Sequence, residues 1–171
     1  IDSQSHADVR RSLELIAQLL GTPQEAARLW QRIEGDIAAA AAQVPEALRG
    51  LRVYVEIGAG PYAAGASSFI GETLARLGMA NAVPPEMGPF PKLNPEFVVR
   101  SQPDIVMAVK RSLQSMRDRP GWHSLHAFQR GRVCGFEPDR YEVLVRPGPR
   151  LGEAARLLAG CLAGLPTDAA R

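Results

Sequence analysis

The stretch GPYAAGAS, residues 60–67, nearly matches a phosphate-binding loop. In the pattern G-x-x-x-x-G-K-[ST], backbone N–H groups and a lysine hold the phosphates of a nucleotide. Gly60 and Gly65 have the required spacing, but Ala66 stands where the lysine is needed. Pro61 also removes one N–H group from the cradle. We therefore expect a glycine-rich turn here and no nucleotide site.

Two histidines are a second candidate for chemistry. His123 and His126 lie three positions apart in GWHSLHAF, a spacing that could place both on one helical face as metal ligands. No cysteine or acidic residue accompanies them at a useful spacing, so surface or capping histidines are the favoured interpretation. A metal-binding protein or metal-dependent enzyme that uses this pair stays open as the alternative function.

The rest of the sequence has no pattern typical of an enzyme. It contains no G-x-S-x-G turn, and its acidic residues are scattered, so no catalytic pair is predicted. We expect a binding protein with no catalytic residue and no cofactor. The net charge of +2, from 20 basic and 18 acidic residues, is too balanced to indicate nucleic-acid binding. No apolar run is long enough to predict a transmembrane helix.

The two cysteines, Cys134 and Cys161, are 27 positions apart. This spacing does not resemble a C-x-x-C redox motif or a zinc site. They could form a disulfide if the protein folds in an oxidising compartment. Two buried thiols that act as small hydrophobic side chains are the other interpretation, and the sequence leaves both open.

Hydrophobic patterning predicts an α/β protein in which strands and helices alternate after a long, broken helical segment. This order is typical of a short, mainly parallel sheet with helices on both faces, preceded by a long linking helix. The predicted strands cover residues 51–57, 81–83, 104–109 and 132–136. The predicted helices cover residues 7–20, 22–44 and 67–78, and further helices begin at Asn94 and Pro149.

Several short segments then occur in a recognisable order. They are SFIGETLARLG with the following Asn81, NPE, QPDIV, the spaced pattern GW--L-A---GRV, and RPGPRL. In this order they resemble the C-terminal lobe of the periplasmic substrate-binding proteins of ABC importers for vitamin B12, haem and iron-siderophores. The resemblance covers nearly the whole chain. It implies one lobe of a two-lobe protein that binds its ligand between the lobes.

The resemblance also implies a domain organisation. Residues 1–50 would be the linking helix and its continuation, and residues 51–171 would be the C-terminal α/β lobe. The N-terminal lobe would belong upstream, and because the given sequence starts at Ile1 with neither an initiator methionine nor a signal peptide, we expect it to be a piece of a longer protein. We expect a periplasmic or lipid-anchored extracytoplasmic protein whose partners are an ABC-importer membrane permease, a metal-chelate ligand and its own missing lobe.

Particular residues match functional positions of the family. Tyr62 and Phe90 match aromatic residues that contact the ligand in the vitamin B12-binding member. Glu142 and Arg146 match an acidic and an arginine contact in the same protein. Glu96 matches the surface glutamate through which this lobe docks onto the permease. The implied ligand is a cobalamin-like corrinoid, haem or a ferric siderophore.

The cysteines depart from the family pattern. The vitamin B12-binding member has a disulfide in this lobe at positions that match Leu77 and Ala159. Neither position is a cysteine here. Any bridge between Cys134 and Cys161 would therefore be a different one.

Overall fold

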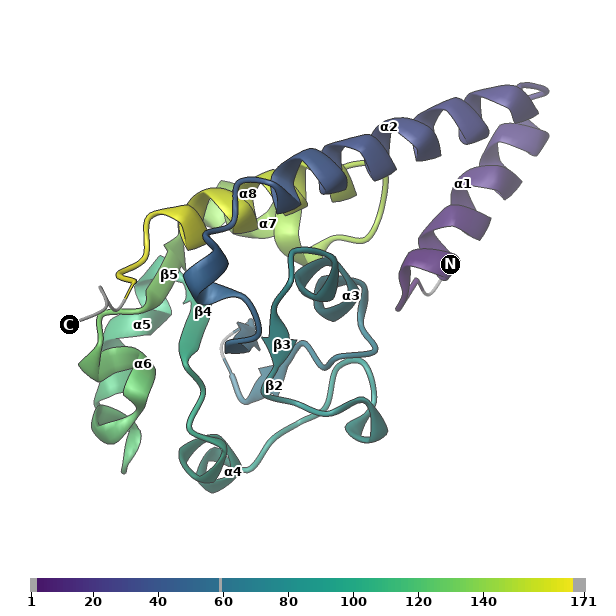
Figure 1. The fold of residues 1–171 in the computed structure, drawn as a ribbon. Coiled ribbons are helices and arrows are strands. Elements are labelled where there is room, and N and C mark those ends of the chain that lie inside the picture. Colours follow the sequence, from purple (N-terminus) through teal and green to yellow (C-terminus); the bar gives the residue numbers. More distant parts are fainter. Residues whose placement is uncertain (1–2, 59, 168–171) are drawn as a thin grey trace.

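A short sheet between two layers of helices forms the centre of the protein (Figure 1), in a computed structural model that describes residues 3–58 and 60–167. Strand β1 pairs in parallel with β3 and β4, and β4 pairs in parallel with β5. Strand β2 adds an antiparallel pair at the carboxyl end of β1. The strands are β1 (Arg52–Ile57), β2 (Tyr62–Ala63), β3 (Ala80–Asn81), β4 (Ile105–Val109) and β5 (Val133–Phe136).

The helices differ widely in length. The longer ones are α1 (His6–Leu19), α2 (Pro23–Ala41), α3 (Phe69–Arg76), α5 (Lys110–Arg117), α7 (Pro138–Val145) and α8 (Leu151–Ala163). The shorter ones are α4 (Pro95–Ser101), α6 (His126–Gln129) and the 3-10 turns η1 (Glu46–Leu48), η2 (Pro85–Met87) and η3 (Trp122–Ser124). No helix within residues 3–58 and 60–167 is long and apolar enough to cross a membrane.

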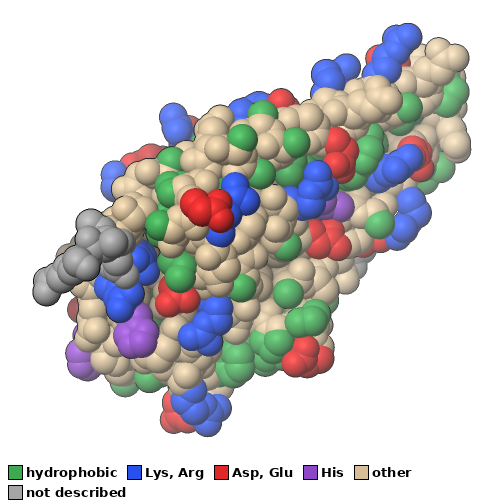
Figure 2. All heavy atoms as spheres, in the orientation of Figure 1, with side chains coloured by type: hydrophobic (Ala, Val, Ile, Leu, Met, Phe, Trp, Pro, Cys, Tyr) green, Lys and Arg blue, Asp and Glu red, His purple; other side chains and the backbone are tan. Residues whose placement is uncertain are grey.

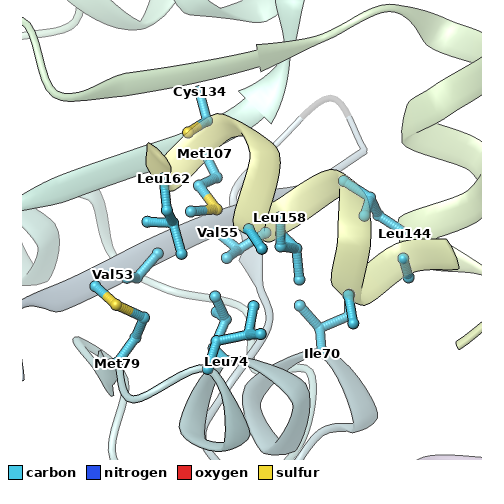
Figure 3. Packing of buried hydrophobic residues seen from close by; sticks show 14 of the residues in the cluster. Val53, Val55, Ile70, Leu74, Met79, Met107, Cys134, Leu144, Leu158 and Leu162 are labelled. Carbon is cyan, nitrogen blue, oxygen red and sulfur yellow. The ribbon is translucent and has the colours of Figure 1, made fainter. Parts of the chain in front are cut away.

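Alternate residues of β1 and β4 face the two helical layers, as period-two side-chain geometry requires. Val53, Val55 and Met107 pack against α2, α3, α7 and α8 in the larger core. Figure 3 shows these sheet residues beside Leu158 of α8 and Leu74 of α3. The opposite face of the sheet packs against α4, α5, η3 and α6 in a smaller core. The members of that core include Tyr54, Val106, Met116, Trp122 and Leu125.

The expected helical segment before the sheet is a pair of helices. The chain turns at Gly21, where φ is +71°, and α1 folds back beside the outer half of α2 (Figure 1). Ion pairs hold the inner half of α2 to the lobe. Asp36 binds Arg156 of α8 at 2.7 Å, and Glu34 binds Arg76 of α3 at 2.8 Å.

Cys134 and Cys161 form a disulfide, with their Cα atoms 6.0 Å apart. The sequence left open whether the two cysteines form a disulfide or remain buried thiols, and in the structure they form the disulfide. The bond joins β5, at the edge of the sheet, to α8, which packs against α2. The Cys134 side chain is fully buried in the larger core (Figure 3).

The four predicted strands and helices α1, α2, α3, α4 and α8 confirm the α/β prediction, with strand ends that differ by one or two residues. Helices α5, α6 and α7 were not predicted from the sequence. Two of these, α5 and α7, are eight residues long, and α5 has only two apolar residues, Leu113 and Met116, so its apolar stripe is too short to stand out in the sequence. Helix α6 has four residues, which is too short for a periodic pattern.

Candidate functional site

The glycine-rich turn is built for close backbone contact. A Cβ atom on Gly65 would lie 2.3 Å from the carbonyl oxygen of Gly88, so only glycine fits there. The N–H groups of Gly65 and Ala66 donate to Pro89 O at 2.8 Å and to Val83 O at 3.1 Å. The N–H groups of Ala63 and Ala64 donate to Pro91 O and Val55 O. These amides are already bonded to protein carbonyls, which agrees with the expectation of no phosphate site.

The same hydrogen bonds bring Tyr62 and Phe90 into adjacent segments. Residues 61–65 run beside residues 89–93, and Leu93 N–H donates to Pro61 O at 2.9 Å. The Tyr62 side chain is exposed, at 47%. Phe90 is half-buried, and its ring lies 5.6 Å from the ring of Phe69 in the core. Phe90 thus anchors the loop, while Tyr62 presents its ring to solvent.

Glu142 and Arg146 form a second pair on α7 and the loop after it. The Arg146 Nε atom lies 2.6 Å from Glu142 Oε2, and both side chains are exposed. They line an open surface hollow of about 360 Å³ together with Pro147, Gly148 and Pro149. Tyr62 and Phe90 do not line this hollow. Within the described ranges, the four predicted ligand residues therefore form two separate pairs.

Tyr141 connects these two pairs through the backbone of β1. Its hydroxyl donates to Glu56 O at 2.7 Å and accepts from Gly58 N–H at 2.9 Å. Burial raises the pKa of Tyr141, so its hydroxyl stays protonated and can donate. Helix α7, which carries Glu142, is thereby joined to the strand end that leads to Tyr62.

Below the turn lies a buried ion pair that the sequence analysis missed. The carboxylate of Glu56 is fully buried, and Arg119 donates to it from Nη1 at 2.5 Å and from Nη2 at 2.9 Å. The Tyr54 hydroxyl donates to the same carboxylate at 3.1 Å. Burial first, and the Glu56 charge second, raise the pKa of Tyr54. The Arg119 guanidinium also lies over the ring of buried Trp122, 4.6 Å from its centre.

Glu96 is exposed in the first turn of α4. Its N–H group donates to the capping side chain of Asn94 at 3.0 Å, which leaves its carboxylate free of the cap. Helix α4 lies on the opposite side of the sheet from α2 (Figure 1). On the face of the molecule in Figure 2, basic and acidic side chains are interspersed, in keeping with the small net charge.

The two histidines do not share a helix, so they do not form one helical face, and their exposure agrees with the favoured interpretation of surface histidines. His123 belongs to η3 and His126 begins α6, and both are exposed. In the part of the chain that the structure describes, no three His, Cys, Asp or Glu residues gather as metal ligands. Nothing in this arrangement supports the alternative function that uses the pair.

A family model described as periplasmic binding protein matches residues 1–139. The chain belongs to this family. It is 26% identical over 167 residues to an uncharacterized ABC transporter substrate-binding lipoprotein, YvrC, of Bacillus subtilis. The alignment covers 92% of this chain and 51% of the relative.

Several solved structures share the fold of this chain. The periplasmic haem-binding protein RhuT from Roseiflexus sp. RS-1 is 27% identical, with a TM-score of 0.72 over 94% of this chain. A possible iron-binding protein from Staphylococcus epidermidis has a TM-score of 0.78 over 94% of this chain at 24% identity, a likeness of fold alone. The same holds for a vitamin B12-binding protein from Vibrio cholerae and a siderophore-binding protein from Bacillus subtilis, at 18% and 16% identity.

This chain spans only part of the proteins that it matches. It corresponds to 51% of the Bacillus subtilis relative, 64% of the Roseiflexus protein and 63% of the Staphylococcus protein.

Proposed function

We propose that this chain is the linking helices, residues 1–50, and the C-terminal lobe, residues 51–171, of the solute-binding component of an ABC importer. The ligand is a flat metal chelate, held in a cleft between this lobe and a second lobe. A permease in the membrane then receives the ligand. The observation that carries this proposal is the pairing of the Tyr62 and Phe90 segments at the carboxyl end of β1, in a chain that belongs to the periplasmic binding protein family.

The chemistry of the two residue pairs fits such a ligand. Corrins, porphyrins and catecholate chelates have flat faces on which an exposed tyrosine ring can stack. They also carry amide, carboxylate or catecholate oxygens that an arginine can bind. In this proposal Tyr62 and the exposed part of the half-buried Phe90 form the stacking surface, Arg146 binds the polar edge, and Glu142 orients Arg146 through their 2.6 Å ion pair.

We place the protein outside the cytoplasm. Three observations support this: the disulfide between Cys134 and Cys161, the family, and the lipoprotein relative. Glu96 is the proposed docking residue for the permease, because its carboxylate is exposed on a short, capped helix. The protein acts in transport and catalyses no reaction.

The direct test is a titration of the full-length protein with cyanocobalamin, hemin and a ferric siderophore, followed by absorbance and tryptophan fluorescence. We expect saturable, stoichiometric binding of one of the three ligand classes. Binding of none would contradict the proposed ligand class. Bound metal that disappears when both His123 and His126 are replaced by alanine would instead favour the metal-binding alternative.

A further inference from the structure

The turn between β1 and β2 rests on supports from both faces of the sheet. On one face, the Tyr141 hydroxyl bridges Glu56 O and Gly58 N–H. On the other face lies the Glu56–Arg119 ion pair. A Cβ atom on Gly60 would lie 3.0 Å from Glu56 Oε1 and 3.1 Å from Arg119 Nη2, so the backbone of Gly60 lies directly on the two charged groups.

The ion pair is itself held rigidly. Both carboxylate oxygens of Glu56 accept from Arg119, which fixes the two planar groups relative to each other. Tyr54 donates to the carboxylate from the same strand. Trp122 lies under the guanidinium and packs edge-on against Tyr54, with ring centres 5.8 Å apart. The buried Tyr54 thus holds the Glu56 carboxylate, and the buried Trp122 holds the Arg119 guanidinium.

Burying a charged pair is expensive, and apolar side chains of similar volume often stabilise a core as well. A pair in this position therefore calls for a reason other than stability. Its place at the carboxyl end of β1, under the turn that leads to Tyr62, supplies one. Tyr62 is the exposed residue of a two-residue strand, and a stacking residue in such a place keeps its orientation better when the turn before it is fixed.

We propose that the Glu56–Arg119 pair, together with Tyr141, is a positioning device that sets the orientation of Tyr62 for ligand stacking. Glu56, Arg119 and Tyr141 are positioning residues that act through the turn, and Tyr62 makes the contact. This inference rests on the proposed function. Affinity for a flat chelate then depends on Glu56, Arg119 and Tyr141, although none of them touches the chelate.

The first arm of the test needs no ligand. Glu56→Gln keeps the shape of the side chain and removes its charge, and Tyr141→Phe removes one hydroxyl. Amide hydrogen exchange is measured on the full-length protein. We expect roughly tenfold faster exchange in residues 60–66 for either variant, with unchanged exchange in α8. Asp36→Asn, which disrupts the ion pair to Arg156 elsewhere on the lobe, is the matched control and should leave residues 60–66 unchanged.

The second arm is a double-mutant cycle with Tyr62→Ala, read by titration with hemin, cyanocobalamin and a ferric siderophore. We expect Glu56→Gln to weaken binding about tenfold when Tyr62 is present and less than about twofold when Tyr62 is alanine. Equal weakening in both backgrounds would overturn the positioning role.

Two further results are decisive. Exchange that stays unchanged in residues 60–66, or that rises equally in α8, would also overturn the positioning role. If Tyr62→Ala does not weaken binding, or if no probe binds, the proposed function fails. The exchange arm then still decides whether the ion pair fixes the turn.

Discussion

Removing the disulfide should destabilise the protein by an amount that its loop length sets. Cys134 and Cys161 are 27 residues apart. Closing a loop of this length removes about 12 cal/mol/K of entropy from the unfolded chain, which is about 3.6 kcal/mol at 25 °C. This is a large share of the ~5–15 kcal/mol that typically separates folded and unfolded domains. Reduction should also loosen β5 from α8, because the bond is their covalent link.

The assay is equilibrium urea unfolding with and without a reducing agent. The wild-type protein should lose about 3–4 kcal/mol of unfolding free energy on reduction. A variant with both cysteines replaced by alanine is the matched control, and reductant should leave its stability unchanged. If reduction changes the wild type by less than about 1 kcal/mol, or changes the variant equally, the loop-entropy reasoning is refuted.

Three other perturbations follow from the described contacts. Gly65→Ala should destabilise the protein by about 1–3 kcal/mol in urea unfolding, because the new methyl group would overlap Gly88 O. Burial lowers the pKa of His6 below 6.5, so the unfolded chain takes up the proton first, and stability measured in urea should fall as pH drops below about 6.5. Glu96→Lys should abolish uptake of the ligand by cells while binding in vitro stays unchanged.

Each of these has a control on the same chain. Gly148→Ala adds a methyl group where no atom lies within 4 Å, so equal destabilisation there would contradict the Gly65 argument. In His6→Gln the loss of stability on acidification should shrink, and an unchanged pH profile would count against His6 as its source. Glu86→Lys reverses another exposed glutamate, and uptake lost equally in both variants would remove the specific docking role of Glu96.

Local patterns predicted the fold well because its main strands are apolar and helices α1, α2, α3 and α8 each carry an apolar stripe. The same patterns could not reveal contacts between distant segments. Glu56 and Arg119 are 63 positions apart, and neither stands in a motif. Glu56 lies in a strand that alternates sides, and its charge among apolar neighbours was the one signal of a buried partner.

The candidate site was predictable only in part, for a similar reason. Tyr62, Phe90, Glu142 and Arg146 were identified through the resemblance to the family, which rests on the order of several short motifs. The spacing of these four residues does not by itself indicate a ligand site. Their grouping into two pairs depends on the backbone pairing of residues 61–65 with 89–93 and on the course of the chain after α7. The disulfide likewise could not be predicted, because the spacing of the two cysteines does not show that β5 and α8 lie close enough to be bridged.

In the proposed function, Tyr62 and Arg146 contact a flat chelate. The most direct measurement is the dissociation constant of the full-length protein for whichever of hemin, cyanocobalamin or a ferric siderophore saturates it. Tyr62→Ala and Arg146→Ala are compared with Arg10→Ala, which breaks a similar exposed pair, to Glu14, on α1. We predict that Tyr62→Ala and Arg146→Ala each weaken binding at least about tenfold, equivalent to about 1.4 kcal/mol each. Arg10→Ala should leave the dissociation constant unchanged. Wild-type affinity in both site variants would contradict the account.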